Sequence, residues 1–195
     1  AEIATWMQDA TNNGEQEVLV LYGYFPETIY PAANAQPDGS IAELFIESTD
    51  GDTIINHADY MFYVTTPCCN GDAALMNMMD TPGINMWDDW RMCVTEDGED
   101  IAPSLVEYQG DALFFWTNRP LHVDLLANEW FVEAVLAEST TGTRAEPVVV
   151  RDGNRGRLIP IFQAANRVDP KGAVAAEVIA WLHGIPLGNP TQLGI

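Results

Sequence analysis

The sequence predicts a single α/β domain, in which a mostly parallel β-sheet carries helices on both faces and ends in an antiparallel C-terminal extension. Two patterns lead to this prediction. In the first half, short apolar runs alternate with segments of helical periodicity, as βαβ units do. In the last third, apolar runs follow one another with a turn signal between two of them, which favours antiparallel pairing. A chain of 195 residues suits one domain over 1–195, with 185–195 as an extended tail.

Four apolar runs predict the first strands. The runs 17–22 (EVLVLY) and 60–66 (YMFYVTT) have the composition of buried strands, and shorter strands are expected at 53–55 and 84–87. The loop 23–38 contains three prolines, and long ordered loops of this kind are often functional. If the runs near positions 19, 62 and 85 lie parallel, the loops that follow them converge on one crevice.

Helical periodicity separates these runs. It covers 2–11, the segment after Ser40 and the segment that starts near Asn70. Ser40 with Glu43 three residues later has the signature of a capping box. The sequence therefore places a helix before the first strand and others between the strands that follow.

The second half continues the pattern with strands and a closing helix. Strands are expected at 112–116, 131–137, 147–151 and 157–163. Asp152-Gly153-Asn154 supplies a hairpin turn between the last two, and 97–100 is expected to be an acidic turn. A helix over 172–183 closes the domain, with Gly184 as its stop. Its expected buried face consists of Val174, Val178, Ile179 and Leu182.

Negative charge dominates the composition. The chain has 29 Asp and Glu against 8 Lys and Arg, a net charge of −21, and its first basic residue is Arg91. Such a surface repels a phosphate backbone, which excludes DNA and RNA as partners. No apolar run approaches the ~20 residues of a membrane-spanning helix, so no membrane segment is expected. The acidity fits either a strongly hydrated surface or a partner that is cationic or carries Ca²⁺.

The C-terminal third resembles a known superfamily. AEPVVVRDGNRGRLIPIFQ, with Gly156-Arg157-Leu158 in a strand, and DPKGAVAAEVIAWLHG, with a helix opened by Gly172-Ala173, are similar to the end of a class I glutamine amidotransferase-like domain of the trehalose-utilisation type. The opening VLVLYG, followed by a long loop and a helix, fits the same order. The resemblance spans most of 16–184 at the level of element order and implies a flavodoxin-like fold.

The catalytic signature of that superfamily is missing. Its enzymes carry a nucleophile on a glycine-flanked strand-to-helix elbow, with a histidine partner, and neither Gly-x-Cys-x-Gly nor Gly-x-Ser-x-Gly occurs here. Cys68 and Cys69 follow a predicted strand, but Pro67 and Asn70 flank them. The resemblance therefore implies a non-catalytic branch, and no catalytic residue is carried over.

The predicted strand ends carry a candidate ligand site. In a doubly wound sheet, ligands bind beyond the carboxyl ends of the strands. Aromatic rings pack on apolar sugar faces, and carboxylates and Arg bind hydroxyls, so we expect a glycan or another small polar ligand. The competing interpretation is that the tryptophans pack in or around the core. The expected ligand-binding residues are Tyr24, Phe25, Thr66, Asn70, Trp87, Asp88, Asp89, Trp90 and Arg91.

Nucleophilic chemistry has weaker candidates. A thiolate of Cys68 or Cys69 paired with His57 or His122 is the minimum for cysteine catalysis, and a helix start near position 70 would lower the thiol pKa. The alternative is that these cysteines are buried or disulfide-bonded, with Cys93 bridged to one of them. Asp88 and Asp89 form an acid/base pair only if the strand has ended before them, because neighbours on a strand point to opposite faces.

No cofactor is expected. Adjacent cysteines do not match the spacing of zinc sites, and the three histidines are scattered along the chain. Ca²⁺ at the acidic segments 50–52 or 96–100 is the one alternative, although neither has the twelve-residue calcium pattern, and both also fit plain acidic turns.

Three functions follow from these patterns. The first is a non-classical glutamine amidotransferase-like domain that binds, and can process, a carbohydrate or similar polar ligand. The second is an assembly module of a cell surface or filament, forming homo-oligomers or part of a larger complex, because the acidic surface and the tail 185–195 suit packing on a neighbour. The third is a hydrolase that uses Cys68 or Cys69.

Overall fold

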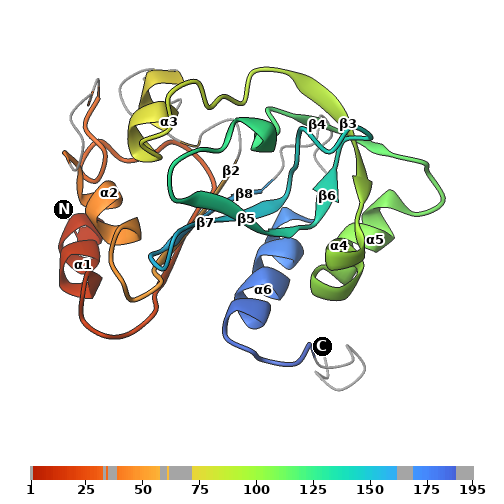
Figure 1. Cartoon of the computed structure of the whole chain (residues 1–195). Helices are drawn as coiled ribbons and strands as arrows, with labels where there is room; N and C mark the ends of the chain where they lie inside the picture. Colours follow the sequence, from red (N-terminus) through yellow and green to blue (C-terminus); the bar gives the residue numbers. More distant parts are fainter. Residues whose placement is uncertain are drawn as a thin grey trace.

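The chain folds into two β-sheets flanked by helices (Figure 1). A computed structural model describes residues 2–32, 34, 39–57, 61, 72–161 and 169–187. The larger sheet has five strands in the order β1-β2-β8-β7-β5, and the smaller one has three in the order β4-β3-β6. The α/β class expected from the sequence is confirmed.

The larger sheet is mixed. Its parallel part consists of β1 (Val18–Leu21), β2 (Thr53–His57) and β8 (Arg157–Ile161). β7 (Val148–Asp152) pairs antiparallel with β8 and with β5 (Trp130–Val135), which forms the far edge. All five residues of β2 are buried, as expected for a strand that is covered on both faces.

Helices cover both faces of this sheet. On one face, Ile54 packs in a core cluster with residues of α1 (Glu2–Ala10), α2 (Ile41–Ile46) and α3 (Asp72–Met78). On the other, Ile55 packs in a second cluster with α4 (Glu96–Ile101), α5 (Pro103–Gln109) and α6 (Lys171–Leu182). Successive β2 side chains thus enter separate cores, because strand side chains alternate between faces.

The smaller sheet adjoins the larger one where β5 leads into β6. β5 continues through the fully buried Leu136 into β6 (Ala137–Glu138), which pairs with β3 (Asp89–Val94). β3 also pairs antiparallel with β4 (Phe115–Asn118). Met92 and Phe115 point into the second core cluster, so the inner face of the smaller sheet is fixed against the rest of the molecule.

Two predictions for the middle of the chain were wrong. Residues 84–87 form no strand and take no part in the parallel sheet. Ile84 and Met86 are fully buried in irregular structure. The apolar pattern of this segment therefore indicated burial but not a strand. The acidic segment 97–100 is part of helix α4. Thr95 caps α4 by accepting a hydrogen bond from the Gly98 N–H at 3.1 Å, and acidic residues in a first helical turn favour the helix dipole.

These corrections change the predicted crevice. The run near position 19 is β1, but the run near 85 lies outside the larger sheet. Most of the predicted strand 60–66 falls outside the described residues. The predicted crevice between the loops after three parallel strands is therefore not formed as expected. The strand β3, which follows the run near 85, belongs to the separate antiparallel sheet.

The predicted C-terminal hairpin and closing helix are confirmed. β7 and β8 form the expected hairpin, and α6 ends before Gly184, which has a φ of +61°. Gly156 lies at a close backbone approach: a Cβ there would stand 2.2 Å from the Asp52 carbonyl oxygen. Val174 and Val178 are buried as expected, whereas Ile179 and Leu182 are half-buried.

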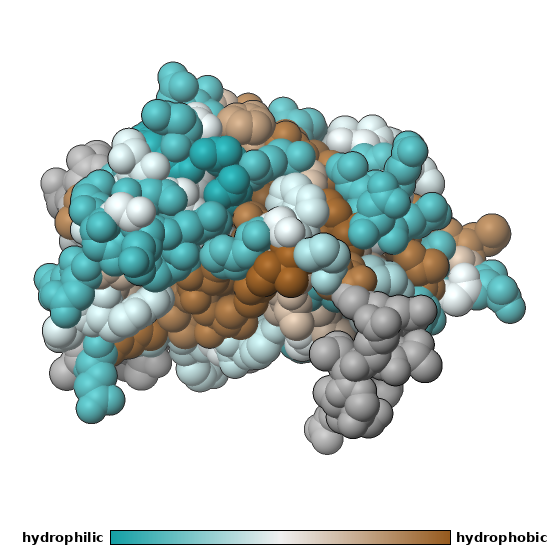
Figure 2. Space-filling view, turned by 90° about the horizontal axis from the view of Figure 1, so that it is seen from below, coloured by the Kyte–Doolittle hydropathy of each residue, from teal (hydrophilic) through white to brown (hydrophobic). Residues whose placement is uncertain are grey.

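The molecular surface seen from below is mostly hydrophilic, with an apolar band across its middle (Figure 2). Among the helices described, none combines the length and apolar character needed to cross a bilayer.

Candidate functional site

The segment 87–91 contains the start of β3, which is the central strand of the smaller sheet. Trp87 and Asp88 precede β3, and the strand begins at Asp89. Cross-strand pairing places Arg91 opposite Trp116 and Asp89 opposite Asn118 of β4. The antiparallel partner therefore adds residues from 116–119 to the segment that the sequence singled out.

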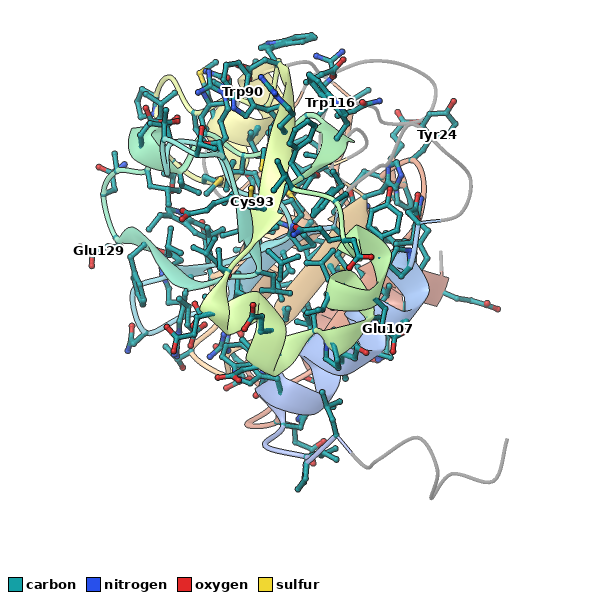
Figure 3. The ribbon with its side chains drawn as sticks, turned by 90° about the vertical axis from the view of Figure 1, so that its right-hand side faces the viewer. Tyr24, Trp90, Cys93, Glu107, Trp116 and Glu129 are labelled. Carbon is teal, nitrogen blue, oxygen red and sulfur yellow. The ribbon has the colours of Figure 1, made fainter. Side chains whose placement is uncertain are left out.

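Three tryptophans in this region each lie under an arginine guanidinium. The Arg119 guanidinium carbon is 4.4 Å from the centre of the Trp87 ring, that of Arg144 is 4.6 Å from Trp90, and that of Arg91 is 5.6 Å from Trp116. The rings stay accessible, with exposed fractions of 51% for Trp87, 38% for Trp90 and 53% for Trp116. We call these six residues the aromatic–arginine cluster. Figure 3 shows Trp90 and Trp116 at the same end of the smaller sheet.

Backbone contacts hold this cluster in place. Arg119 has a φ of +64°, and its Nη1 donates to the Trp87 carbonyl oxygen at 3.0 Å. Its backbone N–H donates to the Asp88 carbonyl oxygen at 3.1 Å. The guanidinium is thus tied to the backbone of the residue whose ring it covers.

Asp88 is the electrostatic centre of the cluster. One carboxylate oxygen contacts Nε2 of His122, and the other accepts hydrogen bonds from Arg144, with Nε at 2.8 Å and Nη2 at 2.6 Å. Arg144 in turn lies on Trp90 and donates to the Thr143 hydroxyl at 2.9 Å. The Asp88 carboxylate therefore orients the arginine that covers Trp90.

The pKa of Asp88 lies below its usual value. Partial burial alone would raise this pKa, but the hydrogen bonds and positive charges of Arg144 and His122 outweigh that effect. Asp88 is consequently ionised at neutral pH and serves as a fixed negative charge rather than as a proton donor.

A pocket of about 310 Å³ opens beside the cluster. That volume lies at the low end of the range for small-ligand sites. Arg91 contributes a guanidinium that also lies 4.8 Å from the centre of the Phe114 ring, and Cys93 contributes a free thiol whose Sγ is 3.2 Å from the Leu113 carbonyl oxygen. The pocket is lined by Trp90, Arg91, Cys93, Leu113, Phe114 and Thr140.

Three of the other predicted ligand-binding residues are described, and each has a different environment. Tyr24 is exposed but lies to one side of Trp116 in Figure 3. Phe25 is fully buried, with its ring edge-on to Tyr30 at 6.3 Å, so it packs in the core. Asp89 is exposed at the start of β3. Thr66, Asn70, Cys68 and Cys69 lie outside the described residues.

The acid–base candidates form no complete catalytic group in the part of the chain described. The His122 ring contacts Asp88, and no described hydroxyl or thiol hydrogen-bonds to it. His57 is buried at the end of β2. Among the described residues, no three His, Cys, Asp or Glu side chains gather as metal ligands would.

Sequence reasoning missed three members of the cluster, namely Trp116, Arg119 and Arg144. Trp116 ends the predicted strand 112–116, of which only 115–116 lie in β4. Its exposure follows from strand alternation, since Phe115 on the opposite face is buried. Arg144 carries no local signal, because it reaches Asp88 from 56 residues away.

A scan against protein-family models gave no match, and neither the curated proteins nor the solved structures contained a match.

Proposed function

We propose that this protein is a binding module for a carbohydrate or a similarly polar, ring-shaped small molecule, which it holds on the aromatic–arginine cluster. The observation that carries the proposal is the stacking of Trp87, Trp90 and Trp116 under three arginines while their rings remain partly open to solvent. Exposed aromatic faces suit the apolar faces of sugar rings, and guanidinium N–H groups suit ring hydroxyls.

Preorganisation supports the proposal. A free arginine or tryptophan side chain would lose rotamer freedom when a ligand binds, which weakens affinity. Here the Asp88–Arg144 ion pair and the bond from Arg119 to the Trp87 carbonyl already restrict these side chains. A ligand would therefore meet a nearly rigid surface.

The fold proposal follows the resemblance of the sequence. We infer a flavodoxin-like, glutamine amidotransferase-like domain without an enzymatic elbow. Its support is the parallel order β1-β2-β8, the hairpin that carries Gly156-Arg157-Leu158, and the closing helix that contains Gly172-Ala173. Arg157 of this motif has a structural role, because its Nε and Nη2 bond the Glu133 carboxylate at 2.5 and 2.9 Å.

The test combines a glycan array with calorimetry on three variants, Trp87→Ala, Trp90→Ala and Trp116→Ala. Each is expected to weaken binding of an array hit by about tenfold or more, because loss of one aromatic anchor in a binding site costs at least ~1.4 kcal/mol. Trp6→Ala is the matched control, since Trp6 is a 39% exposed tryptophan on α1, outside the cluster. Equal binding by all four variants, or no array hit, would contradict the proposal.

An assembly module is the second candidate. A groove of about 460 Å³ is lined by apolar side chains of α6 and the segment after it, including Trp181, Ile185 and Leu187. Ile185 is 57% exposed and Leu187 is 42% exposed. Light scattering across salt and Ca²⁺ concentrations tests it: a concentration-dependent oligomer is expected, and a strictly monomeric protein would eliminate this candidate.

A further inference from the structure

Four of the described arginines form ion pairs, and Arg119 is held by its hydrogen bond to the Trp87 carbonyl oxygen. Arg144 pairs with Asp88, Arg151 and Arg157 with Glu133, and Arg155 with Asp152. Arg91 forms no ion pair with any described carboxylate, and its contacts are the rings of Phe114 and Trp116. In a chain of net charge −21, an exposed guanidinium without a carboxylate partner is unusual.

The stacked position leaves the hydrogen-bonding edge of Arg91 available. A guanidinium that contacts aromatic rings can still use its N–H donors to bond a carboxylate in bidentate fashion. The Arg91 guanidinium lies between the rings of Phe114 and Trp116, which stand at 88° to each other, and Arg91 lines the 310 Å³ pocket. The pocket therefore offers an anion-binding fork together with the ring of Phe114.

Neighbouring acids do not occupy this fork. Asp89 lies on the same face of β3 as Arg91, but it stands at the strand start, while the pocket extends to the other side of Arg91, toward Cys93 and Thr140. Asp88 is engaged by His122 and Arg144. Glu138 pairs with Cys93 across β3 and β6, and like Asp88 and Asp89 it forms no described ion pair with Arg91.

We infer that the pocket beside Arg91 binds the carboxylate of an acidic sugar, so that the ligand is a uronic acid or a comparable carboxylated pyranose. This inference rests on the proposed function and names its ligand class. The carboxylate bonds the Arg91 fork, and the apolar face of the sugar ring packs on Phe114 and Trp90. The balance of charge is local, since the anion meets an arginine that forms no ion pair with a described carboxylate.

The overall charge limits the size of the ligand. At physiological salt the Debye length is about 8 Å, so a single acidic sugar experiences mainly the field of nearby groups. A long polyanion would extend over the acidic surface and be repelled. The pocket should therefore favour a monomer or a terminal residue over a heparin-like polymer.

The experiment compares four probes by calorimetry on the full chain: glucuronate, its methyl ester, glucose and benzoate. Glucuronate is expected to bind at least about tenfold more tightly than the ester or glucose, because only it forms a charge-assisted bidentate contact. Arg91→Gln should remove that preference, and Arg91→Lys should restore part of it. Arg155→Gln is the control, because Arg155 pairs with Asp152 on the β7–β8 hairpin.

Each outcome has one meaning. If glucose binds as tightly as glucuronate and the tryptophan variants still weaken binding, the acidic-sugar inference fails while the proposed function stands. If benzoate binds as tightly as glucuronate, the site selects a flat carboxylate, and the sugar class is wrong. If no sugar binds and the tryptophan variants behave like the parent protein, the proposed function fails as well.

Discussion

The carboxylate of Asp88 bridges Nε2 of His122 and the guanidinium of Arg144, and these two partners lie 34 and 56 residues away along the chain. This bridge connects the start of β3 with two later loops. Its net effect is to depress the pKa of Asp88, so the ionised form is the one that the fold stabilises.

The first prediction concerns acid stability. Because the folded pKa of Asp88 lies below the unfolded value of about 3.9, its contribution is present above that value and is lost as the pH falls through the folded pKa. Asp88→Asn should lower the free energy of unfolding at pH 7 by about 1 kcal/mol, a figure reduced for partial solvent exposure. Chemical denaturation at pH 7 and pH 3 measures it, and the mutant should lose less stability on acidification than the parent.

Asp89→Asn is the matched control for that experiment. Asp89 is exposed and forms no ion pair with a described residue, so its replacement should leave stability within about 0.5 kcal/mol at both pH values. An Asp88→Asn protein as stable as the Asp89→Asn protein at pH 7 would show that the bridge contributes nothing to the fold.

The second prediction concerns the buried carboxyl of Asp52. Burial raises the pKa of Asp52 to about 6, and the neighbouring Glu17 adds to the effect, while hydrogen bonds from the Glu17 N–H at 3.0 Å and the Ser48 hydroxyl at 2.7 Å oppose it. The folded state therefore holds this proton more tightly than the unfolded state does. Stability should fall as the pH rises from about 4 to about 6, and remain reduced above that.

Asp52→Asn tests this relationship. The amide keeps an acceptor for the Glu17 N–H and removes the buried charge, so the free energy of unfolding at pH 8 should rise by about 1–2 kcal/mol. The melting temperature of the variant should also change less than that of the parent protein between pH 4 and pH 8. Asp50→Asn, at a partly exposed neighbour, is expected to do neither. A variant less stable than the parent at pH 8 would contradict the prediction.

The third prediction uses two helical glycines. A Cβ at Gly98 would stand 2.0 Å from the Leu136 carbonyl oxygen, whereas at Gly172 nothing lies within 4 Å. Gly98→Ala should destabilise the protein by about 2–4 kcal/mol, because backbone cannot move aside cheaply in a packed core. Gly172→Ala should stabilise it by about 0.5 kcal/mol through a more restricted unfolded chain. Urea denaturation measures both, and effects of the same sign would refute the proposed close contact.

The fourth prediction concerns the cap of α2. The Ser40 hydroxyl accepts a hydrogen bond from the Glu43 N–H at 3.1 Å, as the capping signature predicted. Ser40→Ala should cost about 1 kcal/mol of unfolding free energy, and Ser40→Thr should recover most of it. If the alanine variant melts at the same temperature as the parent, water or another group must replace the cap.

The fold class was predictable from the sequence, whereas the membership of each sheet was not. Alternation and turn residues located β1, the β7–β8 hairpin and α6, because these signals act within a few residues. The run 84–87 misled the prediction, since an apolar segment is buried equally well as a strand or as irregular chain. The acidic 97–100 segment was taken for a turn, although Thr95 supplies a cap that makes it a helix.

The candidate site was predictable only in part. Trp87, Asp88, Trp90 and Arg91 attracted attention as a dense aromatic and charged segment, and the structure brings four of the predicted residues into the cluster and its Asp88 bridge. Trp116 and Arg119 required knowledge of the β3–β4 register, and Arg144 required the position of a loop more than fifty residues away.

The sequence by itself determined α1, α2, α6, the hairpin, the Ser40 cap and the strong negative charge, because each depends on neighbouring residues or on composition. Only the tertiary structure decided that β3 lies in a second sheet, that three arginines cover three tryptophans, and that Arg91 is left without an ion-pair partner among the described residues. The physical reason is range: propensities act over a few residues, whereas a side-chain contact is set by the packing that brings distant segments together.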